Sequence, residues 1–243
     1  GRATNGTNLD GAEKNSEPPA LLAQGGAILA VGSDVSLAGV TFTDCLAFAQ
    51  ATLEYVAGAA VYLGDGSTGT FRQCHFDNCT STAYGDVIAS TISGYNHIAG
   101  AGGLFVDRSW ATLDHCQFSN CRALSDGNGI AANGGAMHTL NSSSRLTSCV
   151  FRNCSAASPR GSRSVADGGA FFIVGGQAHI ESCSFVSCSA IADGRGSLAL
   201  GGAVFADGFS KLFITGSTIQ DSIVRGYVLN GTDFVLSCAI IIA

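Results

Sequence analysis

Apolar and polar residues alternate in short runs along most of this chain. In the run LTSCVFRNCSA (146–156), inward-type residues such as Cys and Phe alternate with polar ones, which is typical of a strand with one buried face. Apolar residues such as Ile28, Phe105 and Val204 follow Gly-rich segments and predict a second kind of strand. Polar turns such as VGGQ (174–177) separate the strands, and no apolar stripe of helical spacing is long enough to cover a sheet. The pattern therefore predicts an all-β fold.

The strands belong to a repeat of about 34 residues. One column of the repeat holds a large apolar residue: Phe42, Phe76, Phe118, Phe151, Phe185 and Ile219. A second column is a Gly-Gly-Ala-like segment, which begins at Gly25, Gly58, Gly102, Gly134, Gly168 and Gly201. The second repeat carries an insertion over residues 84–100. Parallel strands without crossover helices predict a parallel β-helix, a solenoid of about six rungs in which each repeat forms one rung.

The domain boundaries follow from the extent of this repeat. We expect an extended N-terminal segment over residues 1–20 and a single β-helix domain over residues 21–243. A β-helix without a polar cap exposes strand edges, so we expect the rod to continue into further chain or to stack on another subunit. The apolar run FVLSCAIIIA (234–243) is too short to span a bilayer, and we interpret it as a strand.

A turn former stands two positions after the large apolar residue of each repeat. These residues are Asp44, Asn78, Asn120, Asn153, Ser187 and Asp221. Their types tolerate the left-handed backbone conformation and can hydrogen-bond neighbouring groups. We therefore expect them to stack at one corner of the rod as a ladder of side-chain hydrogen bonds.

The combined motif, Gly-Gly-Ala-[Ile/Val/Phe] followed by Phe-x-Asn-x-x-Ala, resembles the repeat of the chlamydial polymorphic outer membrane proteins. More broadly, residues 21–225 resemble the pectin-lyase-like superfamily of right-handed parallel β-helices. The chain departs from the chlamydial motif by placing cysteine where that motif has its Asn, at Cys45, Cys79, Cys121, Cys154 and Cys188. In this respect it is more similar to Cys-bearing surface proteins of algae and other protists. The resemblance implies a right-handed β-helix in an extracellular adhesive or scaffolding protein.

Ten cysteines suggest an oxidising compartment if they pair. Four repeats carry Cys-x-Phe-x-x-Cys, and we expect both cysteines to point inward. We favour disulfides within a rung, because the two cysteines are gained and lost together in most repeats: Cys74–Cys79, Cys116–Cys121, Cys149–Cys154 and Cys183–Cys188. Pairing between rungs stays open, since stacked cysteines about 4.8 Å apart also fit a disulfide. Cys45 and Cys238 have no obvious partner and are free thiols or pair outside this segment.

Metal binding and thiol catalysis are the functional alternatives for these cysteines. Zinc sites commonly use Cys-x-x-Cys pairs, whereas four residues including a Phe separate the two cysteines here. The Cys-x-x-Cys motif of redox enzymes is also absent from the sequence. We therefore interpret the cysteines as structural and predict no metal site and no cofactor.

Charge and sequons narrow the location and the partners. The net charge of −6 argues against binding to nucleic acid or to an anionic membrane surface, and we predict no membrane insertion. Asn-x-Ser/Thr sequons permit glycosylation in a secretory pathway. Asn78 and Asn153 lie in the expected turn ladder, so Asn5, Asn141 and Asn230 are the better candidates.

No constellation of catalytic residues emerges. Glycoside hydrolysis needs two carboxylates that face one groove. The acids Asp65, Asp126, Asp167, Asp193 and Asp207 each precede a Gly, which is a turn signal. Arg108, Arg145 and Arg195 are scattered, and we expect no column to place an acid beside Arg or Lys. We interpret the histidines, including His138, as surface residues.

The sequence thus predicts a non-enzymatic extracellular protein, a structural or adhesive building block of a cell-surface or fibre assembly. Its expected partners are other protein subunits, further domains of the same chain, and glycans. The alternative is a carbohydrate-binding or carbohydrate-active β-helix, lyase-like or hydrolase-like, with its site in the long loops. Its candidate ligand loop carries Tyr84, Tyr95, Asn96 and His97.

Overall fold

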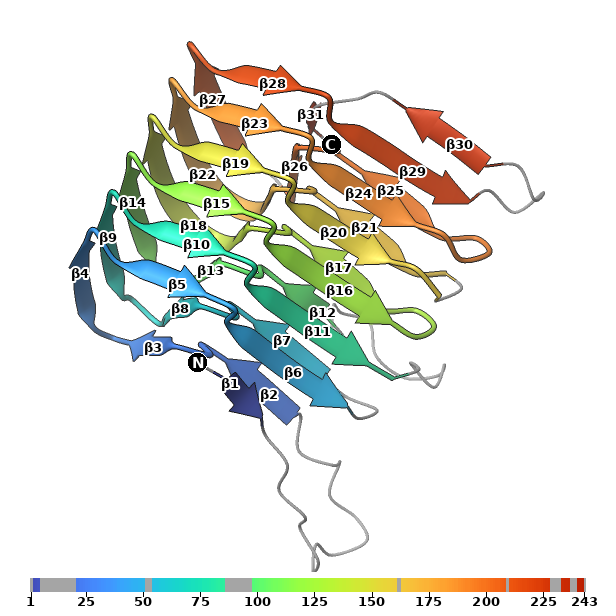
Figure 1. The fold of residues 1–243 in the computed structure, drawn as a ribbon, viewed down its shortest axis with the longest axis horizontal. Coiled ribbons are helices and arrows are strands. Elements are labelled where there is room, and N and C mark those ends of the chain that lie inside the picture. Colours follow the sequence, from blue (N-terminus) through green and yellow to red (C-terminus); the bar gives the residue numbers. More distant parts are fainter. Residues whose placement is uncertain are drawn as a thin grey trace, which may run out of the picture.

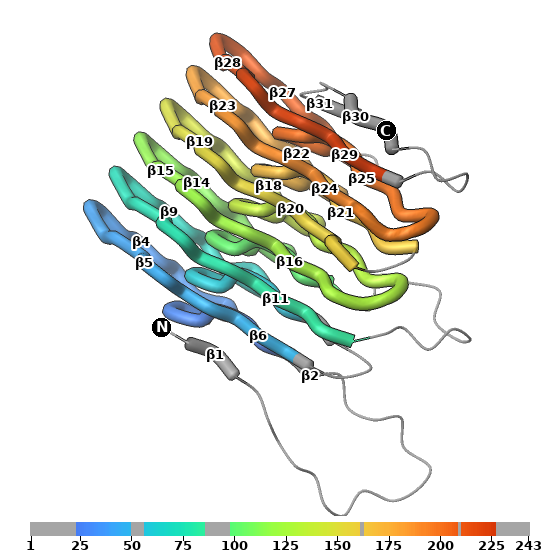
Figure 2. The backbone as a smooth tube through the Cα atoms, turned by 45° about the vertical axis from the view of Figure 1, so that its right-hand side comes forward, coloured from blue at the N-terminus to red at the C-terminus, as the bar shows by residue number. Residues whose placement is uncertain are grey.

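The chain forms a solenoid of stacked β-strands (Figure 1). The computed structural model describes residues 2–4, 21–50, 54–85, 98–160, 163–208, 210–227, 233–236 and 240–242. All regular elements in these ranges are strands, and they lie in four sheets that run along the rod. Figure 2 shows the rungs stacked in chain order, from blue near the N-terminus to red near the C-terminus. The predicted parallel β-helix is confirmed.

Each sheet takes one or two strands from every rung. Sheet A is ordered β1 (Arg2–Thr4), β6 (Leu46–Gln50), β11 (Thr80–Tyr84), β16 (Arg122–Asp126), β20 (Ser155–Ser158), β24 (Ser189–Ala192), β29 (Ile223–Tyr227) and β30 (Asp233–Leu236). Sheet B is ordered β2 (Leu21–Gln24), β7 (Glu54–Ala57), β12 (Ile98–Gly100), β17 (Ala131–Asn133), β21 (Val165–Asp167) and β25 (Leu198–Leu200). Sheet D is ordered β28 (Thr218–Gln220), β23 (Ser184–Val186), β19 (Val150–Arg152), β15 (Gln117–Ser119), β10 (His75–Asp77) and β5 (Thr41–Thr43).

Sheet C turns a corner and contains the remaining strands. They are β3 (Ile28–Val31), β8 (Val61–Gly64), β13 (Leu104–Asp107), β18 (Met137–Thr147), β14 (Trp110–Asp114), β9 (Thr68–Arg72), β4 (Asp34–Ala38), β22 (Phe171–Glu181), β26 (Val204–Asp207), β27 (Lys211–Thr215) and β31 (Ile240–Ile242). The long strands β18 and β22 run through the corner, where the other rungs have two separate strands. The described strand pairs are parallel, apart from β29 with β30.

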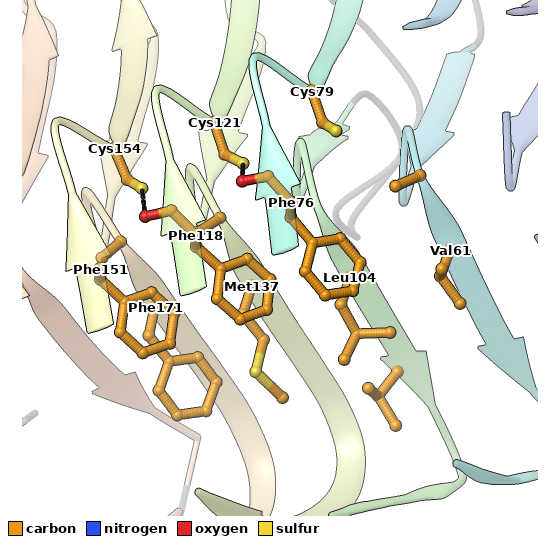
Figure 3. Packing of buried hydrophobic residues seen from close by; sticks show 14 of the residues in the cluster. Val61, Phe76, Cys79, Leu104, Phe118, Cys121, Met137, Phe151, Cys154 and Phe171 are labelled. Carbon is orange, nitrogen blue, oxygen red and sulfur yellow. Dashed lines mark hydrogen bonds between the residues drawn. The ribbon is translucent and has the colours of Figure 1, made fainter. Parts of the chain in front are cut away.

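The predicted column of large apolar residues stacks in register inside sheet D. The rings of Phe42, Phe76, Phe118, Phe151 and Phe185 follow one another at centroid distances of 4.5 to 4.8 Å. Figure 3 shows three of these rings in a row beside Leu104, Met137 and Phe171 of sheet C. Burying one such side chain contributes about 1.5–3 kcal/mol, and each stacked pair adds about 0.5–1.5 kcal/mol. This column therefore contributes to the cohesion between rungs.

The chain turns between strands at four columns of left-handed residues. The first column contains Gly25, Gly58, Ala101, Gly134, Gly168 and Gly201. The second contains Gly32, Asp65, Arg108, Asn141, Gly175 and Gly208. The third contains Gly39, Gln73, His115, Ser148, Ser182 and Gly216, and the fourth is the predicted turn column from Asp44 to Asp221. Non-glycine residues pay about 1–2 kcal/mol for this conformation, so stacking in register must hold them there.

The predicted alignment of the third repeat is wrong by one residue. Leu104 pairs with Val61, so Ala101 and not Gly102 occupies the first corner column. Leu104 therefore faces the interior, and Phe105 lies on the outer side of sheet C. Alignment on the pair Gly102–Gly103 gave the wrong register, because Ala101 adopts the left-handed φ of 49° at this corner in spite of its Cβ.

The interior has a wide part and a narrow part. Between sheets C and D it is filled by Phe, Leu, Ile and Cys side chains. Between sheets A and B it is filled by alanines such as Ala123, Ala156 and Ala166. Because these side chains are small, Cα atoms of the facing strands β12 and β16 approach within 8 Å, against about 10 Å for ordinary stacked sheets.

The first and last rungs are covered only in part by described strands. β1 pairs with β6 at one end, and β30 and β31 pair with β29 and β26 at the other. Inward-facing Val35 and Leu37 at one end, and Leu212 and Ile214 at the other, are only partly buried. Continuation or stacking of the rod stays a prediction.

Candidate functional site

The inward-facing cysteines form two sulfur columns. Column one contains Cys74, Cys116, Cys149 and Cys183, each directly after a third-corner residue. Column two contains Cys45, Cys79, Cys121, Cys154 and Cys188, each directly after a fourth-corner residue. All nine are buried, as predicted from parity, and all nine are free thiols. Cys238 lies outside the described residues.

The within-rung disulfides predicted from the sequence are absent from this structure. A three-residue strand such as β10 (His75–Asp77) lies between the two cysteines of a rung. At about 3.3 Å per residue this strand alone separates them by roughly 10 Å, beyond the Cα distance of about 7 Å that a disulfide bridges. The thiols that contact each other belong to neighbouring rungs, as Cys149 contacts both Cys116 and Cys183.

The thiols bond to the backbone at the corners where they lie. Sγ of Cys121 lies 3.4 Å from the carbonyl oxygen of Phe76 in the preceding rung and 3.6 Å from that of Ser119 (Figure 3). The amide of Cys149 donates to Sγ of Cys183 at 3.4 Å. One rung further, the amide of Cys183 donates to the hydroxyl of Ser217 at 3.0 Å. Cysteine and serine thus perform the same backbone capping.

Burial and mutual contact shift the ionisation of the thiols. Burial raises the pKa of Cys121 and Cys154 well above the usual value, which disfavours the reactive thiolate form of these two cysteines. In column one, contact with its two neighbours raises the pKa of Cys149. The hydrogen bond from Cys149 lowers the pKa of Cys116 to about 7.

The predicted turn ladder forms in part. All six of its residues have φ between 51° and 56°, so the left-handed corner is confirmed. Asn78 donates to Asp44 at 2.7 Å within the column, whereas Asn120 donates to Asp77 of the neighbouring column at 3.1 Å. Backbone hydrogen bonds also join the rungs at this corner, because the amides of Asn120 and Asn153 donate to carbonyls of the next rung.

An ionic cluster lies at the second corner, where we expected no acid beside an Arg. Nη2 of Arg108 lies 2.5 Å from Oδ1 of Asp65 and 3.2 Å from Oδ2 of Asp107. The hydroxyl of Tyr62 donates to the same Oδ2 of Asp107 at 3.2 Å. Burial raises the pKa of Asp107, and burial together with Asp107 raises that of Tyr62. The expectation from the sequence is therefore wrong at this corner.

This cluster suits binding better than proton transfer. Both carboxylates bind one guanidinium nitrogen and lie on the same side of a single Arg side chain, rather than facing each other across a groove as an acid and a base. The Asp65 and Arg108 side chains are 56% and 60% exposed, so the charged groups are open to solvent. Trp110 is also exposed, at 43%, and follows two residues after Arg108. Sequence reasoning missed Tyr62 and Asp107 altogether.

A second feature that the sequence did not reveal is an aromatic column on the outer side of sheet C. It contains Tyr62, Phe105, His138, Phe172 and Phe205, which are buried. His138 lies between Phe105 at 4.4 Å and Phe172 at 4.8 Å, and neither of its ring nitrogens has a hydrogen-bond partner in the described part of the chain. Burial lowers the pKa of His138 to about 3. The prediction that His138 is a surface residue is wrong.

The outer face of sheet B carries another unpaired polar group close to this column. Asp167 is buried at the end of β21, and its Oδ1 has no hydrogen-bond partner among the described residues. Burial, with a smaller contribution from Asp207, raises the pKa of Asp167 to about 8. In the rung before, Asn133 occupies the same position and its Oδ1 is also unpaired within the described ranges.

Other candidate residues are placed apart from these clusters. Tyr84 ends β11 on sheet A, where the centroid of its ring lies 5.5 Å from that of Phe48 and the two rings are tilted by 48°. The rest of the candidate ligand loop, Tyr95, Asn96 and His97, lies outside the described residues, as do Asn5 and Asn230. Asn141 is exposed at the second corner.

The outer face of sheet D is polar and open. A depression on sheet D is lined by Thr41, Thr43, His75, Phe76, Asp77, Gln117, Ser119 and Asn120. Within the described ranges, no three His, Cys, Asp or Glu side chains are grouped to hold a metal ion. No helix in those ranges is long and apolar enough to cross a membrane.

Comparison with known proteins identifies the family. A family model described as a right handed beta helix region matches residues 14–240. No curated protein and no solved structure matches the chain significantly. Because the match covers nearly the whole chain and agrees with the stacked parallel sheets, this protein belongs to the right-handed β-helix family.

Proposed function

We propose that this protein is a non-enzymatic, extracellular structural or adhesive rod that presents its outer faces within a cell-surface or fibre assembly. The observation that supports this most is the filling of the interior by in-register columns of Phe, Cys and Ala. Each rung is bound to its neighbours by stacked side chains as well as by strand hydrogen bonds, which favours a stiff rod. Binding would then occur on the exposed faces and at the ends.

The proposal includes a relationship to particular groups of proteins within the right-handed β-helices. The Gly-rich corner, the Phe column and the Asn-bearing corner support a likeness to chlamydial polymorphic outer membrane protein repeats and to pectin-lyase-like proteins. An extracellular location agrees with the exposed sequon at Asn141. Further rungs or other subunits are the proposed partners, because Val35, Leu37, Leu212 and Ile214 leave apolar surface at the two ends.

The experiment is a direct comparison of binding and cleavage. The secreted protein is incubated with a panel of plant, algal and bacterial polysaccharides, and both retention on the polymer and release of reducing or unsaturated ends are measured. A structural or adhesive rod binds cell-wall or cell-surface material and releases no product. Catalytic release of oligosaccharides would overturn the proposal, and so would the absence of any secreted, glycosylated form in eukaryotic expression.

The ionic cluster favours carbohydrate binding as a second candidate function. Arg108 and Asp65 offer charged hydrogen-bonding groups, and the exposed ring of Trp110 offers an apolar face, which together suit a sugar or uronate ring. The test compares glycan-array binding of the wild type with Arg108→Ala and Trp110→Ala. Lys211→Ala, on an exposed face of the last rung, is the control. Equal binding by all four proteins would exclude this corner.

A further inference from the structure

The sulfur columns place the cysteines of neighbouring rungs side by side. Neighbouring rungs are in register at the flanking strands, since Gln117 pairs with Val150 and Val150 with Ser184. The preceding residues Cys116, Cys149 and Cys183 are therefore stacked. Neighbouring strands of a sheet lie about 4.8 Å apart, inside the Cα range of about 4.4–6.8 Å for a disulfide.

The thiols already touch along each column. Cys149 contacts Cys116 and Cys183 in column one. Cys154 contacts Cys121 and Cys188 in column two. The two cysteines of one rung have no such contact in the structure, because a strand lies between them.

We propose that oxidation cross-links this solenoid between adjacent rungs, through disulfides that join neighbouring members of a single sulfur column. In each step the thiolate of one cysteine attacks a small-molecule disulfide such as oxidised glutathione and displaces one glutathione thiolate. The thiolate of the stacked cysteine then attacks the mixed disulfide and displaces the second glutathione. Two protein thiols are oxidised to one disulfide, and the small disulfide is reduced to two thiols, which take up the two protons that the cysteines lose.

The fold accommodates both redox states. As thiols, the cysteines cap corner carbonyls just as Ser217 does in the last rung. As disulfides, they would close loops of one full rung, which restricts the unfolded chain more than the short loops of the within-rung scheme. Column one is the better starting point, because the hydrogen bond from Cys149 favours the thiolate of Cys116. The proposal does not depend on the biological role of the rod.

Tryptic peptide mapping of the oxidised protein distinguishes cross-rung disulfides from within-rung disulfides. The protein is refolded in a glutathione redox buffer, alkylated and digested without reduction. Cleavage after Arg145, Arg152 and Arg160 places Cys149 in peptide 146–152 and Cys154 in peptide 153–160. Cross-rung pairing links peptide 146–152 to peptide 109–122 or to peptide 164–195. Because these peptides also carry Cys121 and Cys188, fragmentation of the linked peptides must place the bond at Cys116 or Cys183. A link between 146–152 and 153–160, or free Cys149 after oxidation, would overturn the proposal.

A single variant sharpens the test without depending on a folding defect. Cys183→Ser keeps the capping hydroxyl that Ser217 shows to be compatible with this column. We expect Cys149 to pair only with Cys116 in this variant, so that peptide 146–152 is linked to 109–122 alone. Cys188→Ser in column two is the matched control and leaves the pairing of Cys149 as in the wild type. Pairing of Cys149 with Cys154 in either variant would contradict column-wise cross-linking.

Discussion

Replacement of His138 by Phe is the most direct test of the outer aromatic column. The column contains phenyl rings at Phe105 and Phe172 on either side of His138, with ring centroids 4.4 and 4.8 Å away. The imidazole is 2% exposed, and in the described part of the chain neither ring nitrogen has a hydrogen-bond partner. A phenyl ring in this position could pack against Phe105 and Phe172 in the same tilted and edge-on arrangement, without an unpaired polar atom.

The stabilisation expected from His138→Phe has one part that is independent of pH and one part that depends on pH. An unpaired buried polar group destabilises the fold by about 1–3 kcal/mol, which His138→Phe would remove. The slightly larger phenyl ring strains a packed site and offsets part of this gain in stability. We therefore expect His138→Phe to stabilise the fold by about 1–2 kcal/mol at pH 7.5. At this pH both the folded and the unfolded protein carry a neutral imidazole.

The pH-dependent part follows from the lowered pKa. Burial lowers the pKa of His138 to about 3, whereas an unfolded histidine titrates near pH 6.5. Between these values the unfolded state binds a proton that the folded state does not, so wild-type stability is lost as the pH falls below about 6.5. By linkage this loss is about 2 kcal/mol at pH 5, and His138→Phe removes it.

The assay is urea unfolding of both proteins at pH 7.5 and pH 5, followed by far-UV circular dichroism. The stabilisation caused by His138→Phe should grow by about 2 kcal/mol from pH 7.5 to pH 5. His75→Phe, on the exposed face of sheet D, controls for the effect of adding a phenyl ring. Equal pH dependence in the wild type and His138→Phe, or destabilisation at both pH values, would refute the argument.

Three further substitutions test other parts of the fold. Asp167→Asn should stabilise the protein increasingly as the pH rises from about 4 to 8, as measured by chemical denaturation at several pH values. Because the pKa of Asp167 in the folded state is about 8, the free energy of unfolding of the wild type falls by up to about 1.4 kcal/mol per pH unit in this range. Gly135→Ala should destabilise by about 3 kcal/mol in the same assay, because its Cβ would meet backbone atoms of Ser155 at 2.5 Å. Ser158→Ala should raise the thermal midpoint and stabilise by about 1 kcal/mol, because its buried hydroxyl has no described partner and Ala192 fills the same position in the next rung.

Each of these substitutions has its own control and contrary result. Gly39→Ala has open space around the new Cβ and costs only the left-handed backbone, about 1–2 kcal/mol, so an equal cost at both glycines would contradict the steric argument. A uniform gain from Asp167→Asn across the pH range would show that the carboxyl does not hold its proton in the folded state. A lower midpoint for Ser158→Ala would show that the hydroxyl is paired.

The inward columns of this fold could be predicted because apolar residues and cysteines recur at the same places in the repeats and alternate with outward residues within the strands. Phe151 lies in the three-residue strand β19 and Cys149 directly precedes that strand, and the sequence predicts correctly that both are buried. The same alternation fails at sheet C, because both faces of β13 are buried there. Alternation cannot tell an interior residue such as Leu104 from an outer-column residue such as Phe105 when neither is polar.

The ionic cluster was hidden by a shift of one residue in the alignment. When the third repeat is aligned on Gly102, Arg108 falls opposite Gly64, and no acid stands beside it. The observed register places Asp107 opposite Gly64 and therefore Arg108 opposite Asp65. A slip of one residue changes every pairing along a strand, so a site built from two rungs depends on the register of both. Ala101, which breaks the Gly pattern of its column, is the cause.

The recurrence of cysteine is explained by the corners rather than by pairing within a rung. A residue that follows a third-corner or fourth-corner residue points inward, where it meets the carbonyl two positions before it and a backbone carbonyl or amide of a neighbouring rung. A small side chain with a hydrogen-bonding sulfur or oxygen fits this place, which is why Cys183 and Ser217 occupy one column and Cys188 and Ser222 the other. Serine would cap as well but is more polar, whereas a thiol caps weakly and is among the most readily buried side chains. Columns of cysteine therefore allow the same corner to be repeated through a dry core, and the proximity that makes cross-rung disulfides feasible is a consequence of that repetition.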